Sequence, residues 1–166
     1  MGNENKSEIR LLTVDTLAPT LDFGLVTEAN DTFFNRDWIF VNMTASDVNE
    51  ANITFYLYNS SFDQINTTTL LAGNRSHNFS VADLDEAYHY NATMADLAGN
   101  SNTSDARILT LDSTVPTIDF GLGTEVNNTF FSRDWVFVNV SVVEVNVDNL
   151  TFFLFNSTHL VNESVL

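Results

Sequence analysis

The chain of 166 residues contains no cysteine and only six basic side chains. Without cysteine it can form neither a disulfide framework nor a thiolate metal site. The six Lys and Arg stand against 22 Asp and Glu, giving a formal net charge of −16. We therefore expect no nucleic-acid partner, because neutralising phosphates takes clustered basic residues. The acidic charge is typical of solubility, salt adaptation or cation binding.

Long apolar runs and catalytic motifs are missing too. No run of about 18 apolar residues predicts a membrane span, and no signal peptide is visible in this segment. The histidines, at positions 77, 89 and 159, are not spaced as a metal pair, and no phosphate loop, G-x-S-x-G or H-E-x-x-H occurs. We expect a protein that is not an enzyme and that requires no cofactor.

What the chain does contain is a repeat. The segment TVDTLAPTLDFGLVTEANDTFFNRDWIFVN, from Thr13, returns from Thr110 as TLDSTVPTIDFGLGTEVNNTFFSRDWVFVN, an offset of 97 residues. This period is too long for a solenoid repeat and suits a β-sandwich domain. We interpret residues 1–15 as the last strand of a preceding repeat, residues 16–112 as a complete repeat, and residues 113–166 as the N-terminal part of a second, truncated repeat.

Alternation of apolar and polar residues predicts β-strands. Ile39, Val41 and Met43 alternate with side chains of the opposite face, and residues 53–58 follow the same pattern. Residues 81–87 are the one stretch for which we expect a short helical turn. About seven short strands per repeat indicate an all-β fold of immunoglobulin-like antiparallel β-sandwich repeats in tandem.

Asparagine is concentrated in the triplet N-x-S/T, the acceptor signal for N-glycosylation. Of 21 asparagines, 15 begin such a triplet, where chance would give about four. The alternative is that Asn, Ser and Thr are abundant in turns and on exposed strand faces. The candidate acceptors are Asn5, Asn30, Asn42, Asn52, Asn59, Asn66, Asn74, Asn78, Asn91, Asn102, Asn127, Asn139, Asn149, Asn156 and Asn162.

Two motifs carry a family resemblance. The linkers Val14-Asp-Thr-Leu-Ala-Pro-Thr20 and Leu111-Asp-Ser-Thr-Val-Pro-Thr117, with the turn Asp96-Leu-Ala-Gly-Asn100, resemble the bacterial Ig-like (Big-type) repeats of prokaryotic surface proteins. In that family such linkers and turns recur in adhesins, surface-layer proteins and enzyme-associated stalks. The dense acceptor triplets look more like an archaeal surface protein. The resemblance implies an extracellular or cell-surface location and neighbouring Ig-like repeats as partners.

Acidic residues of these motifs are candidate metal ligands. Asp15 and Asp112 occupy matching linker positions, and we expect Asp96 and Asn100 at the same end of the sandwich as the outgoing linker. Their oxygens suit Ca²⁺, and in some arrays of the resembled family Ca²⁺ stiffens the linkers. The alternative is that these residues cap turns. A weaker candidate is the cluster of Asp47, Asn49 and Glu50.

The repeated Arg-Asp-Trp motif places Trp38 and Trp135 as candidate carbohydrate-binding platforms. The alternative is structural, because a repeated Trp more often covers a core or a sheet edge. Trp38 and Phe40 are also predicted to contact a glycan on Asn42.

Together these features predict a non-catalytic stalk or adhesive segment of a large cell-surface or secreted repeat protein. Surface glycans or other cell-surface proteins are its expected partners. The alternative is a carbohydrate-binding or spacer module appended to an exported enzyme.

Overall fold

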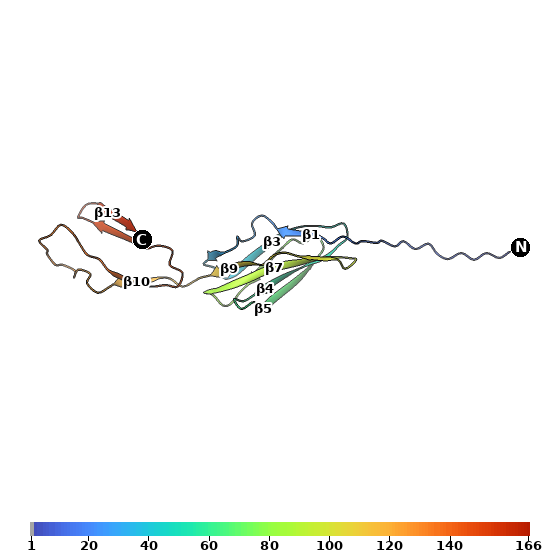
Figure 1. Cartoon of the computed structure of the whole chain (residues 1–166), viewed down its shortest axis with the longest axis horizontal. Helices are drawn as coiled ribbons and strands as arrows, with labels where there is room; N and C mark the ends of the chain where they lie inside the picture. The colour runs from blue at the N-terminus through green and yellow to red at the C-terminus, as the bar shows by residue number, and fades with distance from the viewer. Residues whose placement is uncertain (1) are drawn as a thin grey trace. The chain divides into compact units, whose positions relative to one another are not determined.

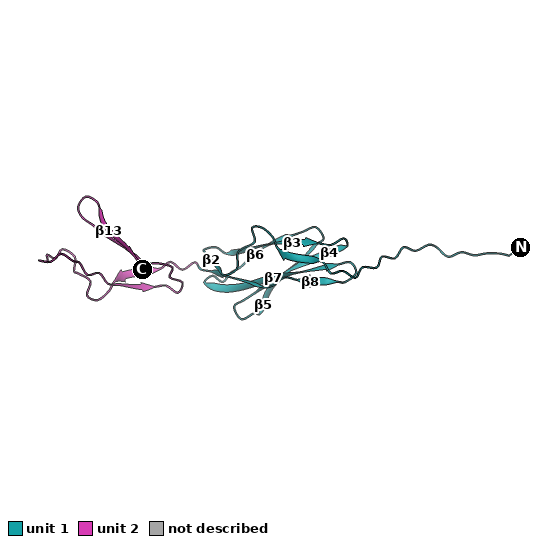
Figure 2. Ribbon diagram, turned by 45° about the horizontal axis from the view of Figure 1, so that its top comes forward, with its two compact units in different colours: residues 1–112 teal, residues 113–166 magenta. Residues whose placement is uncertain are grey.

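The computed structural model describes residues 2–166, and all of their regular elements are β-strands (Figure 1). They form two compact units, the first ending at residue 112 and the second made of residues 113–166, coloured separately in Figure 2. We call them unit 1 and unit 2. Within the described part of the chain, no helix has the length and apolar character that crossing a membrane requires. The all-β fold expected from the sequence is confirmed.

Unit 1 is a two-layer sandwich. The smaller sheet has the order β1-β3-β6 and the larger one β2-β9-β7-β4-β5, with β8 also paired to β7. All pairs are antiparallel except β2 with β9, which run parallel. The chain changes sheets five times: between β1 and β2, β2 and β3, β3 and β4, β5 and β6, and β6 and β7. The strands are β1 (Thr20–Phe23), β2 (Thr32–Phe34), β3 (Trp38–Ser46), β4 (Glu50–Tyr58), β5 (Gln64–Leu71), β6 (Ser76–Ser80), β7 (Glu86–Asp96), β8 (Ser101–Thr103) and β9 (Arg107–Leu111).

The core lies between these sheets and follows the predicted alternation. Side chains from β3 meet those from β4, β7 and β9, and each is at most 2% exposed. The smaller sheet contributes Ile39, Val41, Met43 and Phe79, and the larger one contributes Ile53, Phe55, Leu57, Tyr88, Tyr90, Ala92, Leu109 and Leu111. Burying these apolar faces is the main favourable term for folding.

The helical turn expected at residues 81–87 is wrong, because tertiary contacts satisfy this segment in an open conformation. The N–H of Val81 donates to the Asp37 carbonyl at 3.0 Å. The Tyr88 hydroxyl donates to the Asp83 carbonyl at 2.6 Å. Val81 and Leu84 also pack against the core in this open conformation.

The chain enters and leaves unit 1 at opposite ends of the sandwich (Figure 1). The incoming linker contacts the turns at the start of β4 and the end of β7, where Glu50 pairs with Asp96. The outgoing linker follows Leu111, which pairs with Glu86 at the start of β7. Ten residue steps of β7 separate these two pairs, roughly 33 Å at about 3.3 Å per step.

Unit 2 repeats two of these pairings. Its strands are β10 (Thr117–Phe120), β11 (Val140–Val143), β12 (Thr151–Phe155) and β13 (Leu160–Val165). In the β10–β11 pair Thr117 lies opposite Val143, which is the Thr20–Ser46 pair of unit 1 shifted by 97 residues. The β12–β13 hairpin corresponds to β4–β5, but its loop is one residue shorter.

The strands of unit 2 are short because their partners in unit 1 have no counterpart there. The first half of β3 pairs with β6 and its second half with β1. Only that second half has an equivalent strand in unit 2, namely β11. Residues 129–131, the equivalents of β2, form no strand, since in unit 1 β2 pairs with β9.

Candidate functional site

The incoming linker of unit 1 ends in a cluster of acidic and amide side chains. One carboxylate oxygen from each of Asp15, Asp47 and Asp96 lies within 4.8 Å of the other two. The Asn49 side chain donates to Oδ2 of Asp15 at 2.6 Å, and the Asn100 side chain donates to the Asp15 carbonyl at 3.2 Å. We call these five residues the linker cluster. It ties the linker to the β3–β4 turn and to the β7–β8 turn.

The β7–β8 turn is built around Asp96, which is only 4% exposed. Its two carboxylate oxygens accept hydrogen bonds from the Asn100 N–H at 2.8 Å and from the Asn100 side chain at 2.7 Å. Gly99 has a φ of +94°, which a residue with a Cβ rarely adopts. The motif D-x-A-G-N is thus explained by a tight turn closed by its own side chains.

The same hydrogen bonds set the ionisation of Asp96. Burial by itself raises the pKa of its carboxyl group. Hydrogen bonds from the Asn100 side chain and from the backbone N–H groups of Asn100, Gly99 and Ala98 outweigh burial and hold the pKa below its ordinary value. The turn is therefore stabilised by the charged form of Asp96.

This ionisation predicts an acid-sensitive turn. A carboxylate whose pKa is lowered on folding contributes stability that is fully present above its unfolded pKa of about 3.9 and lost as pH falls through the folded value. Urea unfolding from pH 7 to pH 2 should show wild type more stable than Asp96→Asn at neutral pH, with the difference shrinking below about pH 4. A difference that stays constant over this range would contradict the argument.

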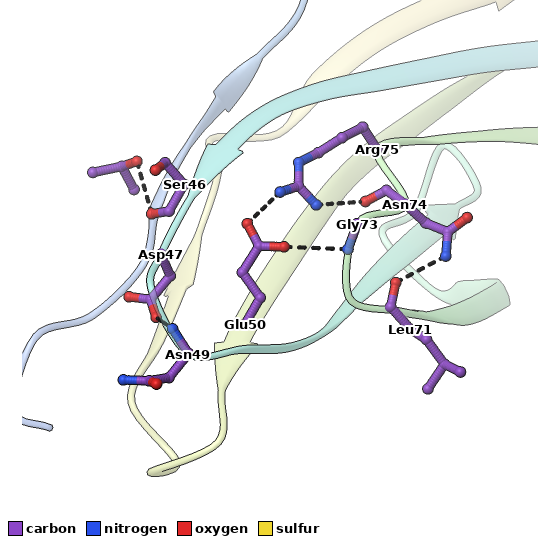
Figure 3. A network of polar contacts seen from close by, with 9 residues as sticks. Ser46, Asp47, Asn49, Glu50, Leu71, Gly73, Asn74 and Arg75 are labelled. Carbon is purple, nitrogen blue, oxygen red and sulfur yellow. Dashed lines mark hydrogen bonds and ion pairs between the residues drawn. The ribbon is translucent and has the colours of Figure 1, made fainter. Parts of the chain in front are cut away.

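Glu50, which neighbours the linker cluster in sequence, serves a different turn (Figure 3). It forms an ion pair with Arg75 and accepts the Gly73 N–H at 3.2 Å. Arg75 also donates to the Asn74 carbonyl at 2.9 Å. Glu50 thus closes the β5–β6 turn.

The metal candidates of the sequence are only partly brought together. Asp15, Asp96 and Asn100 meet, and Asp47 joins them. Asp112 lies at the opposite end of unit 1, where its N–H donates to the Phe34 carbonyl at 2.9 Å. The expectation that the Asp96 turn shares an end with the outgoing linker is wrong, because the whole of β8 and β9 separates them.

The contacts within the linker cluster are those of capped turns. Besides the bonds to Asp96 and Asp15, Oδ1 of Asp47 accepts the Asn49 N–H at 2.7 Å, and Oδ1 of Asp15 accepts the Leu17 N–H at 3.1 Å. These are Asx-type turn contacts. Carboxylate and carbonyl oxygens also suit Ca²⁺. Calcium binding stays a prediction, which a calcium titration followed by the amide signals of Asn49 and Asn100 would test.

Each repeated tryptophan is stacked on an arginine. The Arg36 guanidinium lies 3.9 Å from the Phe34 ring centroid and 3.8 Å from that of Trp38. It also forms an ion pair with Glu28. One face of the indole is therefore covered by a guanidinium, which favours the structural alternative over a sugar platform. The same stack in unit 2 consists of Phe131, Arg133 and Trp135, with Glu125 as the ion-pair partner.

The acceptor candidate Asn42 is held by the loop between β1 and β2. Its side-chain nitrogen donates to the Leu25 carbonyl at 2.9 Å, and its backbone N–H donates to Thr27 Oγ1 at 2.8 Å. Gly24 lies so close that an added Cβ would meet the Asn42 nitrogen at 2.6 Å. The nitrogen that a glycan would occupy is thus hydrogen-bonded and lies against Gly24. This arrangement argues against the predicted glycan on Asn42 in the folded chain.

The corresponding asparagine of unit 2 repeats this arrangement. Asn139 donates to the Leu122 carbonyl at 3.1 Å, and a Cβ at Gly121 would meet its nitrogen at 2.7 Å. Glycine is therefore required at both positions because the asparagine side chain approaches its backbone closely. Each asparagine is required because it holds the loop that follows the glycine. The sequence motif N-x-S/T does not show this, because the glycine lies 18 residues earlier.

We predict that Gly24→Ala destabilises unit 1 by about 1–3 kcal/mol, the usual cost of overpacking a closed site. The Asn42→Ala change alone also costs stability, because it removes the bond to the Leu25 carbonyl. In the double variant the two costs should be clearly less than additive, since the clash is gone. Urea unfolding in a Trp135→Phe background, followed by Trp38 fluorescence, measures all three, with Gly2→Ala, which has open space around it, as the control. Strict additivity would contradict the contact.

The other acceptor candidates are all exposed or half-buried. Asn102 donates to the Pro19 carbonyl at 3.0 Å and Asn74 to the Leu71 carbonyl at 2.9 Å. Asn66 and Asn78 are exposed on β5 and β6. Asn78 also borders a shallow hollow of about 380 Å³, next to Trp38 and Phe40. A glycan near these aromatic rings is therefore better placed on Asn78 than on Asn42.

Comparison with known proteins adds no relative. No protein-family model matches the chain, and no curated protein matches it significantly.

Proposed function

We propose that unit 1 is a non-catalytic spacer in a larger cell-surface or secreted repeat protein. The observation that carries this proposal is the placement of its two linkers at opposite ends of one sandwich. A unit joined in this way adds its own length to a chain of such units. The strand pairs, the core and the contacts of both linkers would then keep the distance between the two ends of unit 1 constant.

The incoming linker is held at several points, as a spacer requires. The linker cluster holds Asp15 by its side chain and its carbonyl. Four residues later Pro19 is buried, and its carbonyl accepts a hydrogen bond from Asn102. A proline also has one backbone angle fixed by its ring. These contacts limit bending between unit 1 and whatever precedes it.

The proposal is tested by ¹⁵N relaxation of the full chain. Residues 15–18 should have order parameters close to about 0.85, as in a rigid backbone, and Asn49→Ala with Asn100→Ala should lower them to below about 0.6. Asn66→Ala, an exposed change on β5, serves as the control. A linker that is already flexible in the wild type would contradict the spacer function.

The alternative function is carbohydrate binding, and the variant Trp38→Ala distinguishes it from a spacer function. A spacer should show the same glycan-array profile before and after Trp38→Ala. A carbohydrate-binding module that uses this ring should lose its signal on the change. The covered indole face favours the first result.

We also propose that the chain is exported and glycosylated at its exposed acceptor triplets. After expression in a host that attaches N-glycans, site-resolved mass spectrometry should find Asn66 and Asn78 modified. Asn42 and Asn139 should be unmodified, because their side-chain nitrogens donate to loop carbonyls. Full occupancy of Asn42 in a folded, unaltered unit 1 would contradict this assignment.

A further inference from the structure

The outer face of the larger sheet of unit 1 carries a line of aromatic side chains. Tyr56 and Tyr58 alternate with core residues of β4, so their rings lie on the outer face, with centroids 6.3 Å apart. The Phe62 ring, in the loop between β4 and β5, lies 6.3 Å from the Tyr58 ring and 3.8 Å from the His89 ring of β7. We call Tyr56, Tyr58, Phe62 and His89 the aromatic face.

Phe62 holds this position at a conformational cost. Its φ is +63°, in a region that a bulky residue rarely adopts. Its ring is nevertheless 59% exposed. Aromatic area in contact with water is unfavourable, so a group that covered the aromatic face would stabilise unit 1.

Asn91 lies beside the two tyrosines of this face. Its neighbours in β7, Tyr90 and Ala92, are 0% exposed, so the Asn91 side chain is on the outer face. It lies directly opposite Tyr56, and its Oδ1 accepts a hydrogen bond from the Tyr58 hydroxyl at 3.4 Å. Opposite residues of an antiparallel pair have Cβ atoms about 4.5–5.5 Å apart. A group attached to Asn91 is therefore within reach of both rings.

The side-chain nitrogen of Asn91 differs from those of the asparagines that hold loops. Several acceptor candidates donate this nitrogen's hydrogen to a backbone carbonyl, namely Asn42, Asn74, Asn102 and Asn139. Among the described residues, the hydrogen bond of the Asn91 side chain is made by its oxygen. Asn91 also begins an acceptor triplet that ends at Thr93. Its nitrogen takes a substituent without the loss of a hydrogen bond of the fold.

We propose that a saccharide attached to Nδ2 of Asn91 lies over the aromatic face, with its first ring on Tyr56 and Tyr58. Attachment forms the bond between Nδ2 and C1 of the first sugar. It breaks the bond between C1 and the phosphate oxygen of a lipid-linked saccharide donor of the exporting cell, and it releases the lipid phosphate and one proton. The inference rests on the proposed glycosylation and adds that one glycan is part of the folded structure of unit 1.

The chemistry of the two surfaces is complementary. A pyranose ring has C–H groups on its faces and hydroxyl groups around its edge. It therefore packs against an aromatic ring while its edge stays hydrogen-bonded. Thr67 lies opposite Tyr56 on the side away from Asn91, at an exposed position, and offers a hydroxyl to that edge.

Asn66 provides the contrast within the same sheet. It lies opposite Leu57, a core residue, on the edge strand β5, and it is exposed. Its side chain is therefore on the other side of the sheet from the aromatic face. A glycan on Asn66 extends into solvent, so of these two glycans only the one on Asn91 should change the stability of unit 1.

Full chains from hosts with and without N-glycan attachment test the proposal. Site-resolved mass spectrometry of the first should find Asn91 modified. Urea unfolding in a Trp135→Phe background, followed by Trp38, then compares wild type with Asn91→Gln. The change should lower the folding equilibrium constant about three- to tenfold more in glycosylated than in unglycosylated chains, a loss of the size of an aromatic contact. Asn66→Gln, the matched control, should have the same effect in both.

The contact with the ring is tested by Tyr56→Thr, which keeps a residue suited to a strand. In this background the extra loss caused by Asn91→Gln in glycosylated chains should disappear. A second measurement needs no change of the aromatic face. In the NMR spectrum of the glycosylated wild type, protons of the first sugar on Asn91 should be shifted upfield by the rings and show nuclear Overhauser effects to Tyr56. Those of the sugar on Asn66 should do neither.

Three results would each overturn the proposal: an unmodified Asn91 in a chain whose Asn66 is modified, an extra loss that survives Tyr56→Thr, or first-sugar protons on Asn91 that resonate like those on Asn66. Each of them leaves the proposed glycosylation of the exposed triplets intact. A chain unmodified at Asn66, Asn78 and Asn91 alike would instead overturn both proposals.

Discussion

Replacing Phe55 by alanine should destabilise unit 1 by about 3–5 kcal/mol, the usual cost of removing a buried aromatic ring. Phe55 is 0% exposed at the centre of β4, and its ring lies 5.9 Å from that of His77 on the opposite sheet. A domain of this size has only about 5–15 kcal/mol of stability, so the variant should be close to unfolding. Urea unfolding in a Trp135→Phe background measures it, with Trp38 as the probe of unit 1.

The repeat provides the matched control for this change. Phe152 is the equivalent of Phe55 in unit 2, but it is only half-buried. Phe152→Ala should therefore leave the unfolding of unit 1, followed by Trp38, unchanged to within about 0.5 kcal/mol, because the residue lies outside that unit. A loss equal to that of Phe55→Ala would contradict the placement of the core in unit 1.

Amide protection against hydrogen exchange should differ between the two units even more strongly. The amides of β4 lie between β5 and β7 above a closed core, whereas β12 pairs with β13 alone. If unit 1 has at least about 5 kcal/mol of stability and isolated unit 2 almost none, protection should differ by roughly a thousandfold or more.

The exchange experiment is run on dilute monomer, so that the protection measured is that of each unit by itself. The residues to compare are 38–58 and 135–155. Equal protection in these two ranges would contradict the expected instability of unit 2.

Much of the sandwich could be predicted from the sequence because period two is a direct consequence of strand geometry. The alternation at Ile39, Val41 and Met43 predicted the inner face of β3 correctly. The expected helical turn at residues 81–87 was wrong because local propensity contains no information about the contact between Tyr88 and Asp83.

The linker cluster was predictable only in part. Asp15 belongs to a linker motif that recurs in the second copy, and Asp96 and Asn100 belong to the recognisable turn motif D-x-A-G-N. Asp47 received less weight because its neighbour Glu50 is replaced in the second copy, yet the structure shows that Glu50 serves another turn. Asp112 was misplaced because matching positions in a repeat lie one whole unit apart, and so at opposite ends of that unit.

The offset of 97 residues between the two copies does not hold beyond the hairpin loop, as the strand pairing shows. Leu57 lies opposite Asn66 in unit 1, and Leu154 lies opposite Asn162 in unit 2. The first residues differ by 97 and the second by 96, because the hairpin loop of unit 2 lacks one residue. Strand register is thus kept while the loop length changes, as expected when one face must remain apolar.

The parallel pair of β2 and β9 has a mechanical consequence for a protein held at both ends. Tension on the two linkers would act first on β1 and, once β1 had separated from β3, would pull the N-terminal side of β2 one way and the C-terminal side of β9 the other. Thr32, Phe33 and Phe34 would then slide against Leu109, Thr110 and Leu111, so their hydrogen bonds would be loaded together and not one after another. Unit 1 would resist stretching by shear strength, a property that its equilibrium stability does not measure.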